Sequence, residues 1–244
     1  MKSQIALIKR NIKETLRDPL SLVFCIAFPV VMLVFMQLII GGLEYVPANF
    51  NIESYAFGIC VFGYTFTGMF VSMNVASDKN SLFIKRIEIS PISRLSYLLS
   101  FFFSALPIAL VQTLLFFAIA IPFGLKPSLT MLLALVYMLP SAVFYISTGI
   151  LIGVLCKNEK QTGPISSILI SAVGMLAGVF MPLSLFSGAA KAVVYILPFS
   201  HTVEIARDLY VTGPESFISH FPYILVYVLI IWGLIIVKEK LFKK

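Results

Sequence analysis

The chain contains a series of apolar segments long enough to cross a lipid bilayer, and this feature constrains its fold more than any other. A helix rises 1.5 Å per residue, so about 20 apolar residues span a hydrocarbon core of about 30 Å. We expect transmembrane helices over residues 20–40, 55–76, 97–121, 131–156, 164–180 and 223–237. Because 59% of the residues are hydrophobic and 12% are charged, a soluble fold of this length would leave apolar surface in water. The predicted fold class is therefore all-α: a polytopic membrane protein with six transmembrane helices in a single domain, residues 1–244.

The basic residues predict how the chain lies across the membrane. Of the 18 Lys and Arg residues, 15 fall in the N-terminal segment, the loops 77–96 and 157–163, and the C-terminal tail; Lys126, Lys191 and Arg207 are the others. Loops rich in Lys and Arg stay in the cytoplasm, so we predict that both termini are cytoplasmic in the plasma membrane, and we expect a prokaryotic source. The net charge of +7 then fits contact with anionic lipid rather than with nucleic acid.

The N-terminal residues 1–18 predict an amphipathic helix at the inner face of the membrane. Ile5, Ile8, Ile12 and Leu16 recur at helical spacing, and the basic residues lie largely on the other faces. Such a helix suits the headgroup plane, with its basic face toward anionic lipid. The alternative is a solvated helix that packs on a partner protein.

Residues 181–222 are too apolar for a solvated loop and too interrupted by proline for another span. A re-entrant hairpin of two short helices on the outer side, between the fifth and sixth spans, fits this pattern. Within it, Glu204 and Arg207 have i,i+3 spacing. These two residues either form an ion pair or lie on a solvated helix face.

Motifs of nucleotide binding and catalysis are absent from the sequence. No G-x-x-x-x-G-K-[ST] phosphate loop occurs, so we do not expect this chain to hydrolyse ATP. The interiors of the predicted spans are nearly free of ionisable residues, which disfavours proton- or sodium-coupled carriers and intramembrane proteases. Cys25, Cys60 and Cys156 are isolated in the sequence. We therefore predict no metal site, no bound cofactor and no enzymatic activity.

Uncharged polar residues and glycines do occur within the predicted spans. The polar ones either make hydrogen bonds between helices or line a substrate path; they are Gln37, Tyr64, Thr65, Thr67, Asn74, Gln112, Thr113, Tyr145, Ser147 and Thr148. The pair Gly149 and Gly153 has the small-x-x-x-small spacing of closely packed transmembrane helices.

The loop 77–96 is the most informative polar segment. It lies on the predicted cytoplasmic side, is mixed in charge and carries the apolar residues Leu82, Phe83, Ile84, Ile87 and Ile89. A short amphipathic helix in this loop would present a docking surface to a cytoplasmic partner. The alternative is a basic loop that lies on lipid.

Two stretches of the sequence resemble the permeases of ABC-2-type transporters. The first resembles that family's cytoplasmic loop and its -SPxSR- turn, and it runs from Asp78 through Glu88-Ile89-Ser90-Pro91-Ile92-Ser93-Arg94 to Tyr97-Leu98-Leu99. The second resembles the family's pattern around its outer re-entrant helices, and it comprises Ala177-Gly178-Val179-Phe180-Met181-Pro182, Leu197-Pro198-Phe199-Ser200-His201 and Ala206-Arg207-Asp208. Their order and spacing, with the six spans and the N-terminal helix, extend the resemblance over essentially the whole chain.

The resemblance implies a permease subunit that forms a homodimer or heterodimer and binds two copies of a separate ATPase subunit, on which ATP and Mg²⁺ reside. The expected cargo is hydrophobic or amphipathic: a drug, an antimicrobial peptide or a lipid-linked glycan. The residues implied in ATPase coupling are Asp78, Leu82, Phe83, Arg86, Ile87, Glu88, Pro91 and Arg94. The residues implied in an outer gate are Met181, Pro182, Pro198, Glu204 and Arg207.

Two other functions compete with this interpretation. A secondary multidrug carrier would transport without any ATPase, and a toxin-immunity membrane protein would bind a toxin without moving it. Transport driven by a proton gradient alone would identify the first, and ATP-dependent efflux would exclude the second.

Overall fold

The structure is a computed structural model of the 244-residue chain. It describes all residues except 1, 43–49, 80, 210–212 and 242–244, and the side chains of Lys2, Glu88 and Leu241 also lie outside the described part. Every regular element in these described residues is a helix, which confirms the all-α class. The shorter helices are α1 (Lys2–Arg17), α5 (Leu82–Glu88), η3 (Ile121–Phe123), α7 (Leu129–Tyr137), η4 (Leu183–Leu185), α10 (Gly188–Ile196) and α11 (Pro198–Arg207). The others are α2 (Pro19–Leu22), the π-turn η1 (Val23–Ala27), α3 (Phe28–Ile40), α4 (Ile52–Lys79), α6 (Arg94–Ala120), α8 (Leu139–Leu155), α9 (Glu159–Leu176) and α13 (Glu215–Leu241).

Five helical segments of the described chain are long and apolar enough to cross a membrane. They cover residues 19–40, 52–79, 94–123, 129–155 and 215–240, and they correspond to five of the six predicted spans. Asp18 begins the first of them, because its carboxylate accepts hydrogen bonds from the amides of Leu20 and Ser21 while Pro19 occupies the first helical position. The fourth is divided into α7 and α8 just before Pro140.

The predicted fifth span, residues 164–180, corresponds to α9 but is not among these five segments. The charged Glu159 and Lys160 belong to its first turn. The helix ends at Leu176, and Gly178 then adopts a left-handed φ of 75°, a backbone conformation that favours glycine. Of the predicted apolar run, only residues 164–176 are therefore helical in α9.

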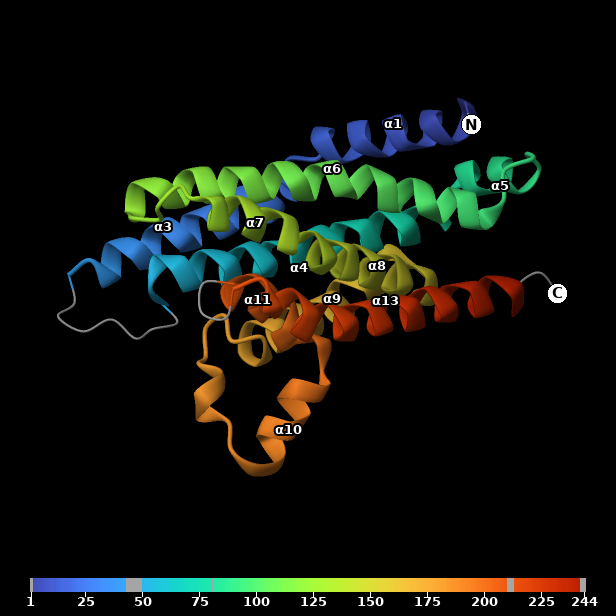
Figure 1. The fold of residues 1–244 in the computed structure, drawn as a ribbon. Coiled ribbons are helices and arrows are strands. Elements are labelled where there is room, and N and C mark those ends of the chain that lie inside the picture. The colour runs from blue at the N-terminus through green and yellow to red at the C-terminus, as the bar shows by residue number, and fades with distance from the viewer. Residues whose placement is uncertain (1, 43–49, 80, 210–212, 242–244) are drawn as a thin grey trace.

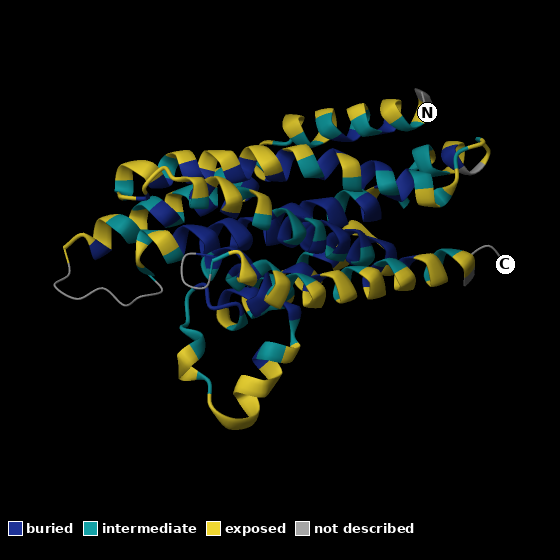
Figure 2. Cartoon of the chain, in the orientation of Figure 1, coloured by how far each residue is buried: buried dark blue, intermediate teal, exposed yellow. Residues whose placement is uncertain are grey.

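The helix α4 occupies the centre of the bundle, and α3, α6, α8, α9 and α11 pack around it. Figure 2 shows it as the most continuously buried helix, and residues 55–68 are all buried. The approach of α4 to α8 depends on glycine: a Cβ on Gly149 would lie 2.1 Å from the carbonyl oxygen of Gly68. This contact confirms the close packing predicted from the Gly149 and Gly153 spacing.

The start of α1 and the end of α13 lie at one end of the elongated bundle, together with α5 (Figure 1). We call this the termini end. The opposite end holds the start of α4, and there Arg207 of α11 donates hydrogen bonds to the carbonyl oxygens of Ser54 (3.3 Å) and Gly178 (3.1 Å). Because α9 begins just after α8 ends at the termini end and finishes beside Gly178, it traverses the bundle from one end to the other.

The helix α1 packs along the N-terminal half of α6 (Figure 1). Leu7 and Asn11 form its buried face, and the Asn11 side-chain amide donates a 3.0 Å hydrogen bond to the Ser100 hydroxyl. Of the predicted apolar stripe, Ile5 and Leu16 are exposed, whereas Ile8 and Ile12 are partly covered.

Two short helices, α10 and α11, occupy the region in which the sequence predicts a re-entrant hairpin. They are not equivalent. The helix α11 is buried against α13, α4 and α7, whereas α10 projects from the side of the bundle and is mostly exposed (Figures 1 and 2).

Candidate functional site

The -SPxSR- turn builds the connection from α5 to α6 through serine hydroxyls. The Ser90 hydroxyl donates to the carbonyl oxygen of Ile87 (2.7 Å) and accepts from the amide of Ile92 (3.3 Å). Ser93 then caps α6 by accepting a 3.1 Å hydrogen bond from the amide of Ser96. Short polar side chains thus end one helix and begin the next, which orients α5 at the termini end.

Asp78, at the end of α4, is the centre of a cluster that joins four helices. Its buried carboxylate accepts two hydrogen bonds from the Arg10 guanidinium of α1, at 2.7 and 2.8 Å. It also accepts one from the Tyr97 hydroxyl of α6, at 2.9 Å. The Arg10 guanidinium carbon lies 4.0 Å above the ring centroid of Phe83 in α5. We call Arg10, Asp78, Phe83 and Tyr97 the brace.

The brace is an electrostatically satisfied site. The hydrogen bond to Asp78 raises the pKa of Arg10, and burial opposes that rise. A planar guanidinium suits this position because it binds a carboxylate through two parallel hydrogen bonds and still stacks on an aromatic ring. Glu14 is a second carboxylate within reach of Arg10, at 3.1 Å, and it is far more exposed than Asp78.

The helix α5 turns one face to the bundle and the other away from it. Ile87 is 5% exposed and belongs to the core, and Phe83 is partly covered. Leu82 and Ile89 are 70% and 89% exposed. Lys85, Arg86 and Pro91 are exposed as well, and the side chain of Glu88 lies outside the described part.

These positions change the expected roles of the coupling residues. The Ile87 side chain is buried within the chain and attaches α5 to the bundle. The outward residues Leu82, Lys85, Arg86 and Ile89 form an apolar and basic surface instead, which we call the α5 face. Arg94 contributes elsewhere, since its guanidinium lies 3.3 Å from the Glu239 carboxylate near the end of α13.

A cavity of about 350 Å³ lies beside the brace, between the ends of α4, α8 and α13 and the start of α6. The Lys79 ammonium borders it and donates hydrogen bonds to the carbonyl oxygens of Val154 and Cys156, the latter at 2.9 Å. A cation on the last carbonyls of a helix is a favourable end contact. The termini end is therefore held together by charged side chains on four different elements.

The opposite end contains the predicted gate residues. Pro198 is buried at the start of α11, and Met181 and Pro182 are partly covered in the segment after α9. No ion pair joins Glu204 and Arg207, which was one of the two alternatives: Arg207 uses its guanidinium on backbone carbonyls, and Glu204 accepts a 3.4 Å hydrogen bond from Tyr195. One carboxylate oxygen of Glu204 and the Nε of Arg207 are buried without a hydrogen-bond partner.

Burial shifts the pKa of both Glu204 and Arg207. It raises the pKa of Glu204 to about 6, with Asp208 adding to the rise. It also lowers the pKa of Arg207, and the neighbouring carboxylates of Glu204 and Asp208 oppose that change. An acid and a base are thus both poorly solvated in one small region.

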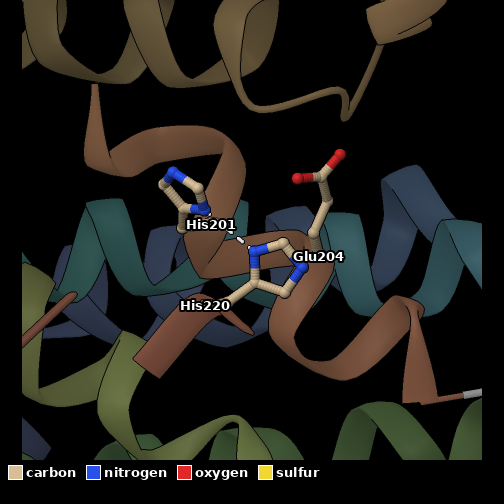
Figure 3. A group of neighbouring side chains, drawn as sticks. All are labelled: His201, Glu204 and His220. Atoms are coloured by element: carbon tan, nitrogen blue, oxygen red, sulfur yellow. Dashed lines mark hydrogen bonds between the residues drawn. The ribbon is translucent and has the colours of Figure 1, made fainter. Parts of the chain in front are cut away.

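His201 and His220 meet beside Glu204, although the sequence predicts no metal ligand there. Figure 3 shows the two rings facing each other, with Glu204 one turn after His201 on α11 and His220 arriving from α13. Their Nδ1 atoms are 2.8 Å apart. The three side chains are a group that could hold a metal ion. Sequence reasoning missed the pair, yet these are the chain's two histidines, and His201-x-x-Glu204 already has the spacing of one helix face.

Several of the polar residues inside the spans make hydrogen bonds between helices. Tyr64 bonds Thr113, Thr67 donates to Gln112 at 3.1 Å, and Trp232 donates to Ser147 at 3.1 Å. These bonds connect α4 to α6 and α13 to α8. They favour the interhelical interpretation over a substrate path lined by these groups within one chain.

A family model described as the ABC-2 type transporter matches residues 4–211, which include the α5 face, the brace, all of α11 and all but the first two residues of α1. No curated protein matches the chain.

Proposed function

This chain belongs to the ABC-2 type transporter family, and from that membership we propose that it is the permease subunit of an ATP-driven exporter. It is a membrane-embedded, multi-pass protein, and permeases of this family work with an ABC ATPase on another chain. ATP and Mg²⁺ would bind that ATPase. The present chain would supply the moving walls of the translocation path.

We place six crossings in the membrane, with both termini in the cytoplasm. Five segments meet the length and hydropathy of a span, and α9 supports a sixth because it runs between the two ends of the bundle. The termini end also holds most of the basic residues, which agrees with a cytoplasmic position. At the opposite end, residues 181–207 would form the outer hairpin and gate.

The α5 face is the observation that supports an ATPase as the partner of this chain. Leu82 and Ile89 are large apolar side chains exposed at the end of the bundle where the basic loops gather, and Lys85 and Arg86 lie between them. Apolar side chains at the centre of a surface with basic neighbours are typical of a protein interface. The partner should therefore offer an apolar pocket with acidic residues at its rim.

The position of α4 supports a path between two permease copies. A buried helix fills the centre of the chain, and its polar groups are paired with its neighbours. A substrate would thus move along the surface that two copies share. The low charge of the spans favours a hydrophobic or amphipathic cargo, such as a drug, an antimicrobial peptide or a lipid-linked glycan.

Co-expression tests this proposal. Each ABC ATPase of the source cell that lacks a membrane domain would be expressed in turn with the full chain, purified with it and assayed for ATP hydrolysis. We expect one ATPase to co-purify in equal amount with the permease. Burying a Leu or Ile contributes about 1.5–3 kcal/mol, so Leu82→Asp with Ile89→Asp should weaken this association more than about tenfold.

The matched control is Leu129→Asp, which alters a leucine at the start of α7 that is 74% exposed, against 70% for Leu82. Association should survive that change, because α7 is remote from the α5 face. Transport of cargo in proteoliposomes driven by a proton gradient, with no ATPase present, would instead identify a secondary carrier. A chain that binds a toxin but never moves it would be an immunity protein.

A further inference from the structure

The hydrogen bonds around His201 and His220 determine which ring nitrogens carry protons. The Nε2 atom of His201 lies 2.9 Å from the carbonyl oxygen of Tyr195, which only accepts. The Nε2 atom of His220 lies 3.2 Å from a carboxylate oxygen of Asp208, which also accepts. Both Nε2 atoms are therefore the donors, and each neutral ring presents a bare Nδ1 lone pair.

These two lone pairs point at each other across 2.8 Å. Two acceptors at that separation repel unless a cation lies between them. Glu204 adds a third acceptor, because one of its carboxylate oxygens is buried and has no partner in the described chain. One possible ligand atom from each of His201, Glu204 and His220 lies within 4.8 Å of the other two.

We propose that His201, His220 and Glu204 form a binding site for a divalent transition-metal ion of the zinc class. Imidazole nitrogen and carboxylate oxygen are ligands that Zn²⁺ takes at about 2.0–2.2 Å, in tetrahedral geometry. Tetrahedral bonds of that length place two nitrogens about 3.3 Å apart, so the histidines need to separate by only about half an ångström. Three protein ligands leave the fourth position for water.

The groups that accept hydrogen bonds from the two histidines favour a bound metal ion over a proton shared between the rings. Histidine ligands commonly donate their other ring nitrogen to a carboxylate or a backbone carbonyl, which orients the ring. Asp208 and the Tyr195 carbonyl provide one of each. His201 also stacks on Tyr223, with the ring centroids 4.2 Å apart.

Occupancy would join α11 to α13 at the end of the bundle remote from the α5 face. A bound ion would hold the buried helix of the outer segment against the last span. This site makes no use of the ATPase, so its test is independent of the proposed transport function.

Titration with cobalt(II) tests the site on the purified full chain, in detergent and with an affinity tag that lacks histidine. After removal of metals with chelator, we expect one Co²⁺ per chain, ligand-field bands of a nitrogen and oxygen site, and displacement by Zn²⁺. Thiolate charge-transfer bands should be absent, because the three cysteines are buried elsewhere.

Four variants identify the ligands. Glu204→Gln and His220→Gln should each lower Co²⁺ affinity more than about tenfold, and Asp208→Asn about 10- to 100-fold through the second shell. Glu215→Gln, an exposed carboxylate in the first turn of α13, should leave the affinity unchanged. If His220→Gln does not fold, the nearly isosteric Glu204→Gln decides the question. Failure of the wild-type chain to bind one ion, or equal binding by Glu204→Gln, would mean that the histidines share a proton and no metal site exists.

Discussion

The two ends of the bundle both bury charged side chains, but they satisfy them to different degrees. At the termini end, the Asp78 carboxylate accepts three hydrogen bonds, from Arg10 and Tyr97. At the other end, Glu204 and Arg207 each keep a buried polar atom without a partner. A buried group without a partner costs about 1–3 kcal/mol, so the outer end carries an energetic penalty that the termini end avoids.

This difference suggests different tasks. A satisfied four-helix cluster transmits force as a rigid unit, which suits the place where an ATPase would push. A region with buried polar atoms that lack a hydrogen-bond partner can gain one by binding a ligand or by changing its conformation. The following predictions test whether the two ends differ in this way.

The largest effect should come from Asp78→Asn. This change leaves the half-buried Arg10 guanidinium with a weak neutral partner, and breaking a fully buried ion pair costs about 3–5 kcal/mol. Because the Arg10 side chain is 30% exposed, we expect a loss of about 2–3 kcal/mol in unfolding free energy. Labelling of the three buried cysteines by a thiol-reactive dye during heating or denaturation would measure it.

Glu14→Gln is the control for Asp78→Asn, since Glu14 is the second carboxylate beside Arg10 and its side chain is 48% exposed. Its effect should stay below about 0.5 kcal/mol. If both variants lost the same stability, the brace would be an ordinary surface ion pair.

A smaller effect is expected from Arg10→Lys. Lysine keeps the positive charge but loses the paired hydrogen bonds to Asp78 and the planar contact with Phe83. We expect a loss of about 1 kcal/mol by the same thiol-labelling measurement. Full stability in Arg10→Lys would show that charge alone, without the fork geometry, holds α1 to α4 and α5.

The smallest effect, and one of opposite sign, should come from Glu204→Gln in protein stripped of metal. Burial raises the Glu204 pKa to about 6, so above that pH the folded chain holds a poorly solvated charge. Removal of the charge should stabilise the chain by about 1 kcal/mol above pH 6. The gain should disappear below the ordinary Glu pKa of about 4.3, where wild-type Glu204 is itself neutral.

Zinc sharpens this last prediction. With Zn²⁺ at 100 times its dissociation constant, the wild-type chain should gain about 2.7 kcal/mol, and Glu204→Gln should then be the less stable protein. If Glu204→Gln were less stable than the wild-type chain in the presence of chelator, the buried polar groups of the outer end would be as well hydrogen-bonded as those of the termini end.

The sequence alone predicts much of this protein because the relevant signals are local. Apolar runs of about 20 residues predict membrane helices. Serine and proline mark the ends of helices within one turn. The family match over residues 4–211 confirms the resemblance drawn from residues 78–99 and 177–208. The helical class, the -SPxSR- turn and the close packing at Gly149 are all found in the structure.

Only the tertiary structure decided which distant side chains meet. Arg10 and Asp78 are 68 positions apart in the chain, and His201 and His220 are 19 apart on different helices. A periodic pattern states that α5 has two faces, but not that Ile87 turns inward and Ile89 outward. The facing of a helix depends on the neighbours that cover it, and hydrogen bonds form between groups that packing brings within about 3 Å. Those contacts join residues that are distant in the sequence, so no local sequence pattern predicts them.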